Sequence, residues 1–496
     1  MGTNVNNPKR PVATQSGGNG VTGTPGDDST VEDDSTLEKF LSKQRREFLK
    51  DLDDGKGDQW QVVMGNEAGD LDSLASSISY AYLSSTFFSR STIPLVLTAP
   101  EHMSLRLENL HALQLASLSP SVLLHSSQLP CPPADLTARG VHFVLVDHNS
   151  LLPQFGHGAV DVIIDHHVDE GNHPSAQRLI TTTGSCSSLV VKYFRRPWQD
   201  HIPTSDDKGQ DAKLVDTGVA TLLLAAMVVD TGGLRPGGKA TRIDNESAAF
   251  LYPLTSLSPP SRFGSHPVTQ TLAEINTSST GPSDITPENI GTNPPIPLTK
   301  LTNDLTQAKF NVSHLSTPEL LLRDYKEYVL PTSSKTYPTL RLGLSTVPLC
   351  LETWLDRDTH GWTPFLLAVD DYMEKKQLNI LGILTTFRDD KDKSRREILL
   401  IVGPGKGLPE REEQKVIVEL AKGMEESGEV LDLGAWGSKK SSKGTLGNHQ
   451  GVYDQAVKDF LEKGDGRVGR VWQQRNTKST RKQVAPILRD LIKDLQ

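Results

Sequence analysis

Three apolar segments of this chain run directly into acidic residues, and this pattern constrains the fold more than any other feature. The segments cover residues 61–66, 141–147 and 160–165, and each has the length and composition of a buried strand. A further strand is predicted at residues 93–99. Helical spacing of apolar residues is found in segments before, between and after these strands, at residues 37–52, 71–87, 103–116, 188–194 and 217–230. Strands separated by helices predict a parallel sheet with helices on both faces.

The acidic residues at the strand ends are expected to lie together, because parallel strands of an open sheet end at the same edge. Acidic and imidazole side chains occur at this edge: Asp70, Asp72, Asp147, Asp165, His148, His166 and His167. A fifth carboxylate, Asp230, ends a long apolar segment. Carboxylates confined in a small space raise one another's pKa, so the group predicts bound cations. Oxygen and nitrogen ligands without sulfur suit Mn²⁺, Mg²⁺ or Co²⁺.

Each acid taken singly has a purely structural interpretation. Asp70 or Asp72 could cap the following helix, Asp147 could begin a turn, and Asp230 could precede a helix end. The prediction of a metal site therefore depends on the ordered set of acids, each at the end of a predicted strand or buried helix.

Composition excludes several classes of protein. The 496 residues include 61 acidic and 52 basic side chains, a net charge of −9, so duplex nucleic acid and anionic membranes are not expected partners. The three cysteines are far apart in the sequence and lack CxxC spacing, which indicates neither a disulfide framework nor a thiolate zinc site. No signal-peptide pattern or membrane-spanning apolar stretch is present, so a cytoplasmic location is expected.

Four parts are expected along the chain. Residues 1–33 are predicted to be a disordered tail and residues 34–253 the metal-binding domain. Residues 254–316 are rich in Ser, Thr and Pro and predict an insertion or linker with one short helix. Residues 317–496 are predicted to form a mixed α/β domain. Its expected helices cover residues 317–330 and 479–495, and its expected strands cover residues 340–349, 379–387 and 397–403.

The sequence motifs GNEAGDLDSLAS, LVDHN, IIDHH and MVVDTGG occur in the order of the four motifs of the DHH phosphoesterase superfamily. The chain most closely resembles the exopolyphosphatase branch, which is similar to family II inorganic pyrophosphatases and prune-type phosphodiesterases. The resemblance resumes at RDYKEY, GLSTVP, ILTTF and STRKQVAP, in a DHH-associated C-terminal domain. It implies an N-terminal parallel-sheet domain, a smaller mixed α/β domain, and an active site in the cleft between them.

The resemblance also assigns metal ligands. It implies two divalent ions, with Asp70 on one, Asp72 on the other and Asp147 bridging them. His166 and Asp230 would complete the ligands of the second ion. The remaining ligand position, on the first ion, falls on Asn66, where pyrophosphatases have histidine and exopolyphosphatases typically have asparagine.

Catalytic and substrate-binding positions follow from the same resemblance. His167, and with it His148, would contact the substrate phosphate or the leaving oxygen, and Asp165 would hold the histidines by hydrogen bonds. Lys326, Arg481 and Lys482 match positions that bind phosphate, although Thr480 replaces the usual serine before Arg481.

Two loops leave alternatives open. The backbone N–H groups of residues 184–188 could face an anion, or the serines could simply cap the next helix. The basic residues 437–444 could guide a long polyanion or form a solvated surface loop.

The implied function is an exopolyphosphatase that hydrolyses the terminal phosphate of inorganic polyphosphate by two-metal activation of water, acting as a monomer. Two alternatives use the same motifs: an inorganic pyrophosphatase or prune-like cyclic-nucleotide phosphodiesterase, and an inactive scaffold with the same fold. The intact DHH motif argues against the prune type, in which arginine commonly replaces the second histidine. The complete ligand set argues against the scaffold.

Overall fold

The computed structural model describes residues 36–202, 215–258, 285–359, 361–403, 407–409, 411–436 and 468–496. The predictions for residues 1–33 and 437–444 lie outside the described residues, as does the part of the Ser/Thr/Pro-rich segment at 259–284. Among the helices that are described, none has the length and apolar character needed to cross a membrane.

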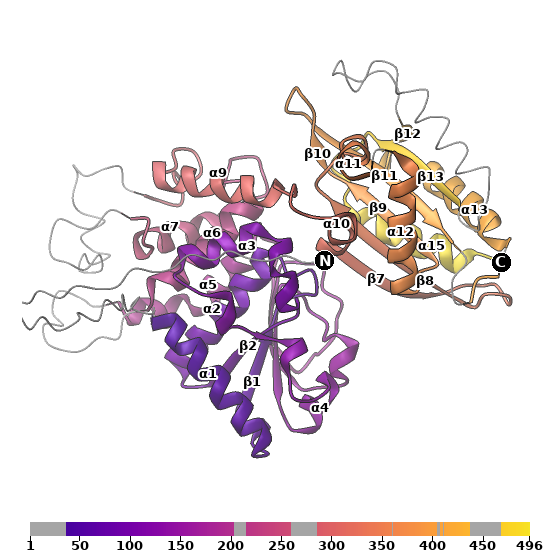
Figure 1. The fold of residues 1–496 in the computed structure, drawn as a ribbon. Helices are drawn as coiled ribbons and strands as arrows, with labels where there is room; N and C mark the ends of the chain where they lie inside the picture. Colours follow the sequence, from indigo (N-terminus) through magenta and orange to yellow (C-terminus); the bar gives the residue numbers. More distant parts are fainter. Residues whose placement is uncertain are drawn as a thin grey trace, which may run out of the picture. The chain divides into compact units, whose positions relative to one another are not determined.

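The N-terminal domain contains a six-stranded sheet in which every neighbouring pair is parallel (Figure 1). Its strands are β1 (Trp60–Met64), β2 (Ser91–Val96), β3 (Leu124–His125), β4 (His142–Val146), β5 (Val160–Asp165) and β6 (Gln177–Ile180). The order is β3-β2-β1-β4-β5-β6, so the chain leaves β1 toward one edge and returns to pair β4 on its other side. Ligand sites of open parallel sheets form at the carboxyl ends of strands at such a reversal. The ends of β1 and β4 are therefore the expected position of the site.

Helices bury both faces of this sheet. Successive strand residues alternate between two apolar clusters: Val63 and Val144 join one, and Val62 and Phe143 join the other. The helices of this domain are α1 (Thr36–Asp53), α2 (Leu71–Phe88), α3 (Leu107–Leu115), α4 (Pro133–Ala138), α5 (Cys186–Asp200), α6 (Thr217–Thr231) and α7 (Arg242–Leu251). Because both faces are covered, the strands are largely apolar, although β1 contains Gln61 and β4 begins with His142, and the acids of the site lie at or after the strand ends.

Helix α9 (Ile296–Phe310) lies in the segment predicted to be an insertion or linker. It packs against α3 and α6, and its Leu298, Leu301 and Leu305 belong to the core of the N-terminal domain. The predicted domain boundaries remain predictions.

The C-terminal domain has a mixed seven-stranded sheet. Its strands are β7 (Tyr325–Pro331), β8 (Thr339–Val347), β9 (Ile380–Thr385), β10 (Phe387–Arg388), β11 (Ser394–Val402), β12 (Leu433–Ala435) and β13 (Val468–Gln474). The order is β12-β13-β11-β9-β8-β7, with β10 paired to β11, and only β8 and β9 are parallel. The predicted fold class, a parallel-sheet domain followed by a mixed α/β domain, is confirmed.

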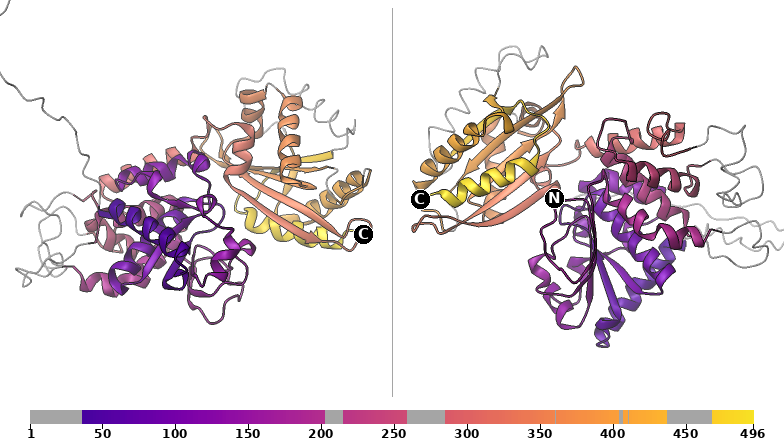
Figure 2. Two further views of the ribbon diagram at one scale, coloured as in Figure 1. Left: turned by 60° about the horizontal axis from the view of Figure 1, so that its bottom comes forward. Right: turned by 180° about the vertical axis from the view of Figure 1, so that it is seen from behind.

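Helices also cover both faces of the second sheet (Figure 2). They are α10 (Thr317–Arg323), α11 (Leu351–Trp354), α12 (Trp362–Lys376), α13 (Glu412–Glu426) and α15 (Arg481–Asp494). Helices α10, α11 and α12 share one apolar cluster with alternate strand residues, whereas α13 and α15 share the other.

The single helix predicted for residues 317–330 is wrong. Helix α10 ends at Arg323, and residues from Tyr325 onward form β7, which pairs with β8 along its whole length. Tyr328 and Leu330 pack on one side of the sheet and Tyr325 on the other, which is a period of two. The long-range pairing with β8 outweighs the local helical pattern.

Adjacent leucines of α12 provide a test of the core. Leu366 is 6% exposed and Leu367 is 64% exposed. Leu366→Ala is expected to lower the free energy of unfolding by roughly 2–5 kcal/mol, because it leaves a cavity in the core. Leu367→Ala makes the same substitution on the same helix and should change it by less than about 0.5 kcal/mol. Urea denaturation measures both, and equal losses would contradict the packing described.

Candidate metal centre

The carboxylate of Asp147 occupies the middle of the site. Asp147 follows β4 with φ at 62°, a left-handed conformation that aspartate adopts more readily than most residues. Its Oδ2 accepts hydrogen bonds from Asn66 Nδ2 at 2.7 Å and Ser73 Oγ at 2.6 Å. Its Oδ1 lies 3.3 Å from His166 Nε2 and 3.6 Å from His167 Nδ1. The predicted bridging carboxylate therefore turns one oxygen to its supports and the other to the histidines.

His166 and His167 follow β5. In each ring, Nδ1 donates a hydrogen bond that fixes the orientation of the ring. His166 Nδ1 donates to Thr183 O at 3.0 Å, which turns Nε2 toward Asp147. His167 Nδ1 donates to Asp165 Oδ1 at 2.8 Å. One ligand atom from each of Asp147, His166 and His167 lies within 4.8 Å of the others. This spacing fits a metal ion bound by mixed oxygen and nitrogen ligands.

Asp165 supports the histidines. It is fully buried and accepts the backbone N–H groups of His166 and His167 at 2.8 and 3.1 Å, while Asn149 Nδ2 donates to its Oδ2 at 2.5 Å. Burial opposes ionisation, but the His167 and Asn149 hydrogen bonds hold the pKa of Asp165 below its usual value. Asp165 thus lies in hydrogen-bond contact with His167, and its supporting role stays a prediction.

Asp72 lies in the first turn of α2 and is 1% exposed. Its Oδ1 accepts from Ser185 Oγ, Ser187 N and Ser187 Oγ at 2.7, 2.8 and 2.7 Å. Among the described residues its Oδ2 accepts only from Cys186 N, at 2.6 Å, and so keeps a lone pair for a cation. The N–H groups of Cys186 and Ser187 thus face a carboxylate supplied by the chain itself, and no hydrogen bond from the Ser185 side chain caps α5.

Asp70 is the N-cap of α2 and accepts from Ser73 N at 3.1 Å. Burial works against its charge, but Arg106 and the Ser73 hydrogen bond hold the pKa of Asp70 below its usual value. Asp230, at the end of α6, lies 3.5 Å from Lys309 Nζ of α9. Burial and the charge of Asp72 raise the pKa of Asp230 to about 7, although the charge of Lys309 acts in the opposite direction.

The donor set fits divalent cations. Burial and the charges of Asp70 and Asp72 raise the pKa of Asp147 well above its usual value, against the attraction of His166. Asp147 and Asp230 would both ionise readily beside bound cations, because opposite charge favours the carboxylate form. Asn66 Nδ2 donates to Asp147. Among the described residues, its Oδ1 accepts only from Ala68 N, at 2.9 Å. That oxygen retains a lone pair for a metal.

His148 has a buried nitrogen without a partner among the described residues. Its Nδ1 donates to Val146 O at 3.0 Å, and its Nε2 is enclosed with no hydrogen bond. Burial lowers the pKa of His148, so the neutral ring presents a lone pair at Nε2. At this edge of the sheet, the unpartnered His148 Nε2 is an acceptor, so it can bind a ligand or a donor group of the substrate. It is less able to donate a proton.

The three predicted substrate-binding cations have different surroundings. Lys326 Nζ lies 3.7 Å from Glu67 Oε1. The two terminal nitrogens of Arg481 donate to Asp324: Nη1 to its backbone oxygen at 2.8 Å, and Nη2 to its Oδ1 at 2.9 Å. Burial, together with the charge of Lys239, lowers the pKa of Lys482.

Several residues of the site were missed by the sequence interpretation. Ser73 and Asn149 directly follow Asp72 and the Asp147-His148 pair, so the motifs contained the signal. Lys309 had no comparable signal, because it lies in the segment taken for a linker and reaches Asp230 only through the packing of α9.

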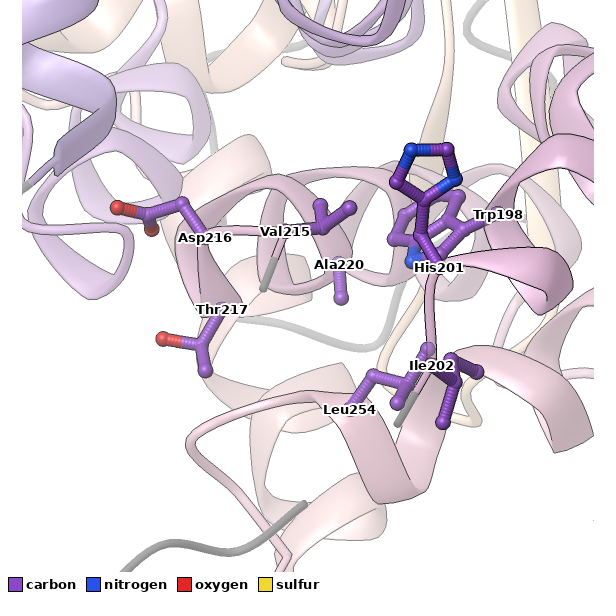
Figure 3. A pocket seen from close by; sticks show the side chains of 8 residues that line it. All are labelled: Trp198, His201, Ile202, Val215, Asp216, Thr217, Ala220 and Leu254. Carbon is purple, nitrogen blue, oxygen red and sulfur yellow. The ribbon is translucent and has the colours of Figure 1, made fainter. Parts of the chain in front are cut away.

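A small enclosed pocket in the N-terminal domain contains none of these residues (Figure 3). It holds about 20 Å³, enough for one water. Its lining comes from Trp198, His201, Ile202, Val215, Asp216, Thr217, Ala220 and Leu254.

Comparison with known proteins agrees with the geometry. The model of the DHH family, N-terminal domain, matches residues 60–227, and the DHHA2 domain model matches residues 303–491. A putative exopolyphosphatase of Schizosaccharomyces pombe is 26% identical over 446 residues, covering 88% of this chain and 92% of that protein. Exopolyphosphatase PRUNE1 of Rattus norvegicus is 25% identical over 304 residues, which cover 60% of this chain and 54% of that protein. The human PRUNE1 protein is 22% identical over 68% of this chain and 62% of its own length.

Metal binding is expected to release protons. Burial disfavours the imidazolium, but Asp147 and Asp72 raise the pKa of His166 to about 10 in the metal-free protein. At pH 8 this ring is protonated, and a metal ligand must be neutral, so Mn²⁺ binding should release about one proton from His166. Affinity for Mn²⁺ should accordingly rise with pH up to about 10.

Titration calorimetry in two buffers of different ionisation enthalpy measures the released protons. His166→Gln, in which the amide does not titrate, should reduce the number by about one. An unchanged number would show that His166 is not a ligand.

Proposed function

Because this chain belongs to the DHH phosphoesterase superfamily, we propose that it is an exopolyphosphatase that hydrolyses the terminal phosphate of inorganic polyphosphate. The observation that carries the proposal is the Asp147 carboxylate, which has one oxygen fixed by Asn66 and Ser73 and the other facing two histidines. The likeness to the Schizosaccharomyces pombe protein along nearly the whole of both chains supports this branch.

Two divalent cations, Mn²⁺, Mg²⁺ or Co²⁺, would be held by six side chains, those of Asn66, Asp70, Asp72, Asp147, His166 and Asp230. When bound, they would supply the Lewis acidity that activates water and neutralises phosphate charge. Two of these ligands are already held by hydrogen bonds: Asp72 by the loop at 184–188, and His166 by Thr183. Ligands fixed in this way need little reorganisation when metal binds.

His167 is the proposed proton donor to the leaving phosphate. Its Nδ1 is committed to Asp165, so the proton to be transferred would be carried on Nε2. Asp165 keeps a lowered pKa and therefore stays ionised, so its Oδ1 remains an acceptor that orients the ring of His167. The side chain of His167 is 35% exposed, consistent with access to a substrate.

Binding of the polyanion would fall to cations of the C-terminal domain. Lys326 and Lys482 can act as point charges for phosphate oxygens, whereas Arg481 must first share its guanidinium with Asp324. Lys309, beside Asp230, is a further cation at the metal ligands. These local positive charges allow an acidic protein to bind an anionic substrate.

The function is tested by phosphate release from long polyphosphate, triphosphate, pyrophosphate and cyclic AMP, each with Mg²⁺, Mn²⁺ or Co²⁺. Long polyphosphate is expected to have the highest kcat/KM, because a long polyanion can engage the metals and the lysines of the C-terminal domain together. Fastest cleavage of pyrophosphate or cyclic AMP would instead favour the pyrophosphatase or prune-like alternative.

Asp147→Asn provides the control for this assay. The amide keeps the shape but removes a charge from the bridging position, so phosphate release should fall by at least about 10³-fold. Normal metal-dependent release by Asp147→Asn would end the two-metal proposal. Absence of Mn²⁺ binding by the wild-type protein would instead support the inactive scaffold.

His167→Gln tests the proton donor separately from the metals. The amide can still hydrogen-bond but cannot transfer a proton, so kcat should fall by about 10²–10⁴-fold with little change in KM. Calorimetry should find two bound Mn²⁺ ions as in the wild type, and loss of either ion would assign His167 to the metals instead.

A further inference from the structure

Asp244 is a buried carboxylate outside the expected ligand set. It lies in the first turn of α7 and is fully buried. Its Oδ2 accepts from Thr241 N, Thr241 Oγ1 and Gly184 N at 2.7, 2.8 and 2.8 Å. Its Oδ1 accepts from Ser185 N and Ser188 Oγ at 3.2 and 2.6 Å. The Thr241 bonds form a local helix cap, but the other three reach a loop at 184–188.

That loop contacts the predicted ligands of the second metal. On one side, Thr183 O accepts from His166 Nδ1. On the other, Ser185, Cys186 and Ser187 together give Asp72 four hydrogen bonds. The side chain of Asp244 is thus one hydrogen bond away from groups that orient two different ligands.

The loop also packs directly against the end of α6. A Cβ on Gly184 would lie 2.4 Å from Thr231 Cγ2 and 3.1 Å from Asp244 Oδ2. Thr231 is the neighbour of Asp230, the third predicted ligand of the same metal. The close approach requires glycine and leaves the loop little freedom to shift without changing these contacts.

We propose that Asp244 is a positioning residue for the second metal, acting through the loop that orients Asp72 and His166. The inference rests on the proposed two-metal function. Asp244 cannot itself be a ligand in this arrangement, because five hydrogen bonds occupy the roughly four lone-pair directions of its carboxylate. Its effect reaches the metal only by fixing Gly184 and Ser185.

The carboxylate is needed because every group that faces it is a donor. In Asp244→Asn one oxygen becomes an NH₂ group, which would meet either Gly184 N and Thr241 N or Ser185 N and Ser188 Oγ. The NH₂ group then faces N–H groups that can only donate, so the loop must move or lose hydrogen bonds. A shifted loop would present different donors to Asp72 and release the ring of His166.

The competing interpretation is that Asp244 only stabilises the start of α7. A matched control separates the two. Asp216 caps α6 in the same domain, accepting from Gly218 N at 2.7 Å and Leu37 N at 2.9 Å. None of its described contacts involves residues 183–188. Asp216→Asn therefore weakens the start of another helix in the same domain, because its NH₂ group would meet either Gly218 N or Leu37 N, and it leaves the loop untouched.

The experiment titrates the full-length, metal-free protein with Mn²⁺ by calorimetry, at a temperature below the melting transition of every variant. Wild-type protein is expected to bind two ions. Asp244→Asn should weaken one of them by about 10–100-fold, as loss of a hydrogen-bond partner behind a ligand typically does, and leave the other unchanged. Asp216→Asn should lower the melting temperature but bind both ions as the wild type does.

Wild-type affinity at both sites in Asp244→Asn would overturn the inference and leave the proposed function intact. Failure of the wild type to bind two ions would overturn both. If Asp244→Asn does not fold, Ser188→Ala decides, because it removes only one of the five hydrogen bonds. It should weaken the same ion by about 2- to 10-fold, and no weakening would overturn the inference.

Discussion

The carboxylate of Asp147 is the point on which the site is built. It lies at the end of β4 beside the end of β1, where the chain reverses direction across the sheet. Donors from three separate segments meet there: Asn66 after β1, Ser73 in α2 and His166 after β5. A buried carboxylate needs such donors, since burial without them would neutralise it. The parallel sheet brings these segments to one edge, so the fold and the site are determined by the same arrangement.

Hydrogen bonds extend outward from Asp147 and its neighbours in ordered steps. Asp165 holds His167 and is itself held by Asn149, while Asp72 is held by the loop that Asp244 holds in turn. Burial, together with the charges of neighbouring carboxylates, raises the pKa of Asp147 and of Asp230. The chain supplies hydrogen bonds to most of these side chains, although His148 Nε2 has none among the described residues, and the negative charge of the site is left for cations.

The sequence predicted the elements that local patterns determine. The strands β1, β2, β4 and β5 and the helices α1, α2, α3, α5 and α6 were predicted from their apolar segments, and the acids followed directly at the ends of strands. The strands β3 and β6 and the helices α4 and α7 were not predicted. What local patterns do not contain was missed. Residues 325–331 become a strand only by pairing with β8, Lys309 reaches Asp230 only because α9 packs on α6, and Asp244 meets its loop across about 60 residues of sequence. The ligand assignments came from resemblance and remain predictions.

The charge balance around Asp324 bears on how Arg481 can act on a substrate. Asp324 accepts from Arg481, and its pKa is lowered, despite burial, by Arg481 and Arg106. Nearby, Glu108 pairs with Arg323 at 2.9 Å and with Arg106 at 3.4 Å. Three guanidinium groups thus lie among three carboxylates, because Arg106, besides its contacts with Glu108 and Asp324, also lowers the pKa of Asp70 against the effect of burial. The charges of this network balance, so a phosphate bound by Arg481 would have to compete with Asp324 for the donors of that guanidinium.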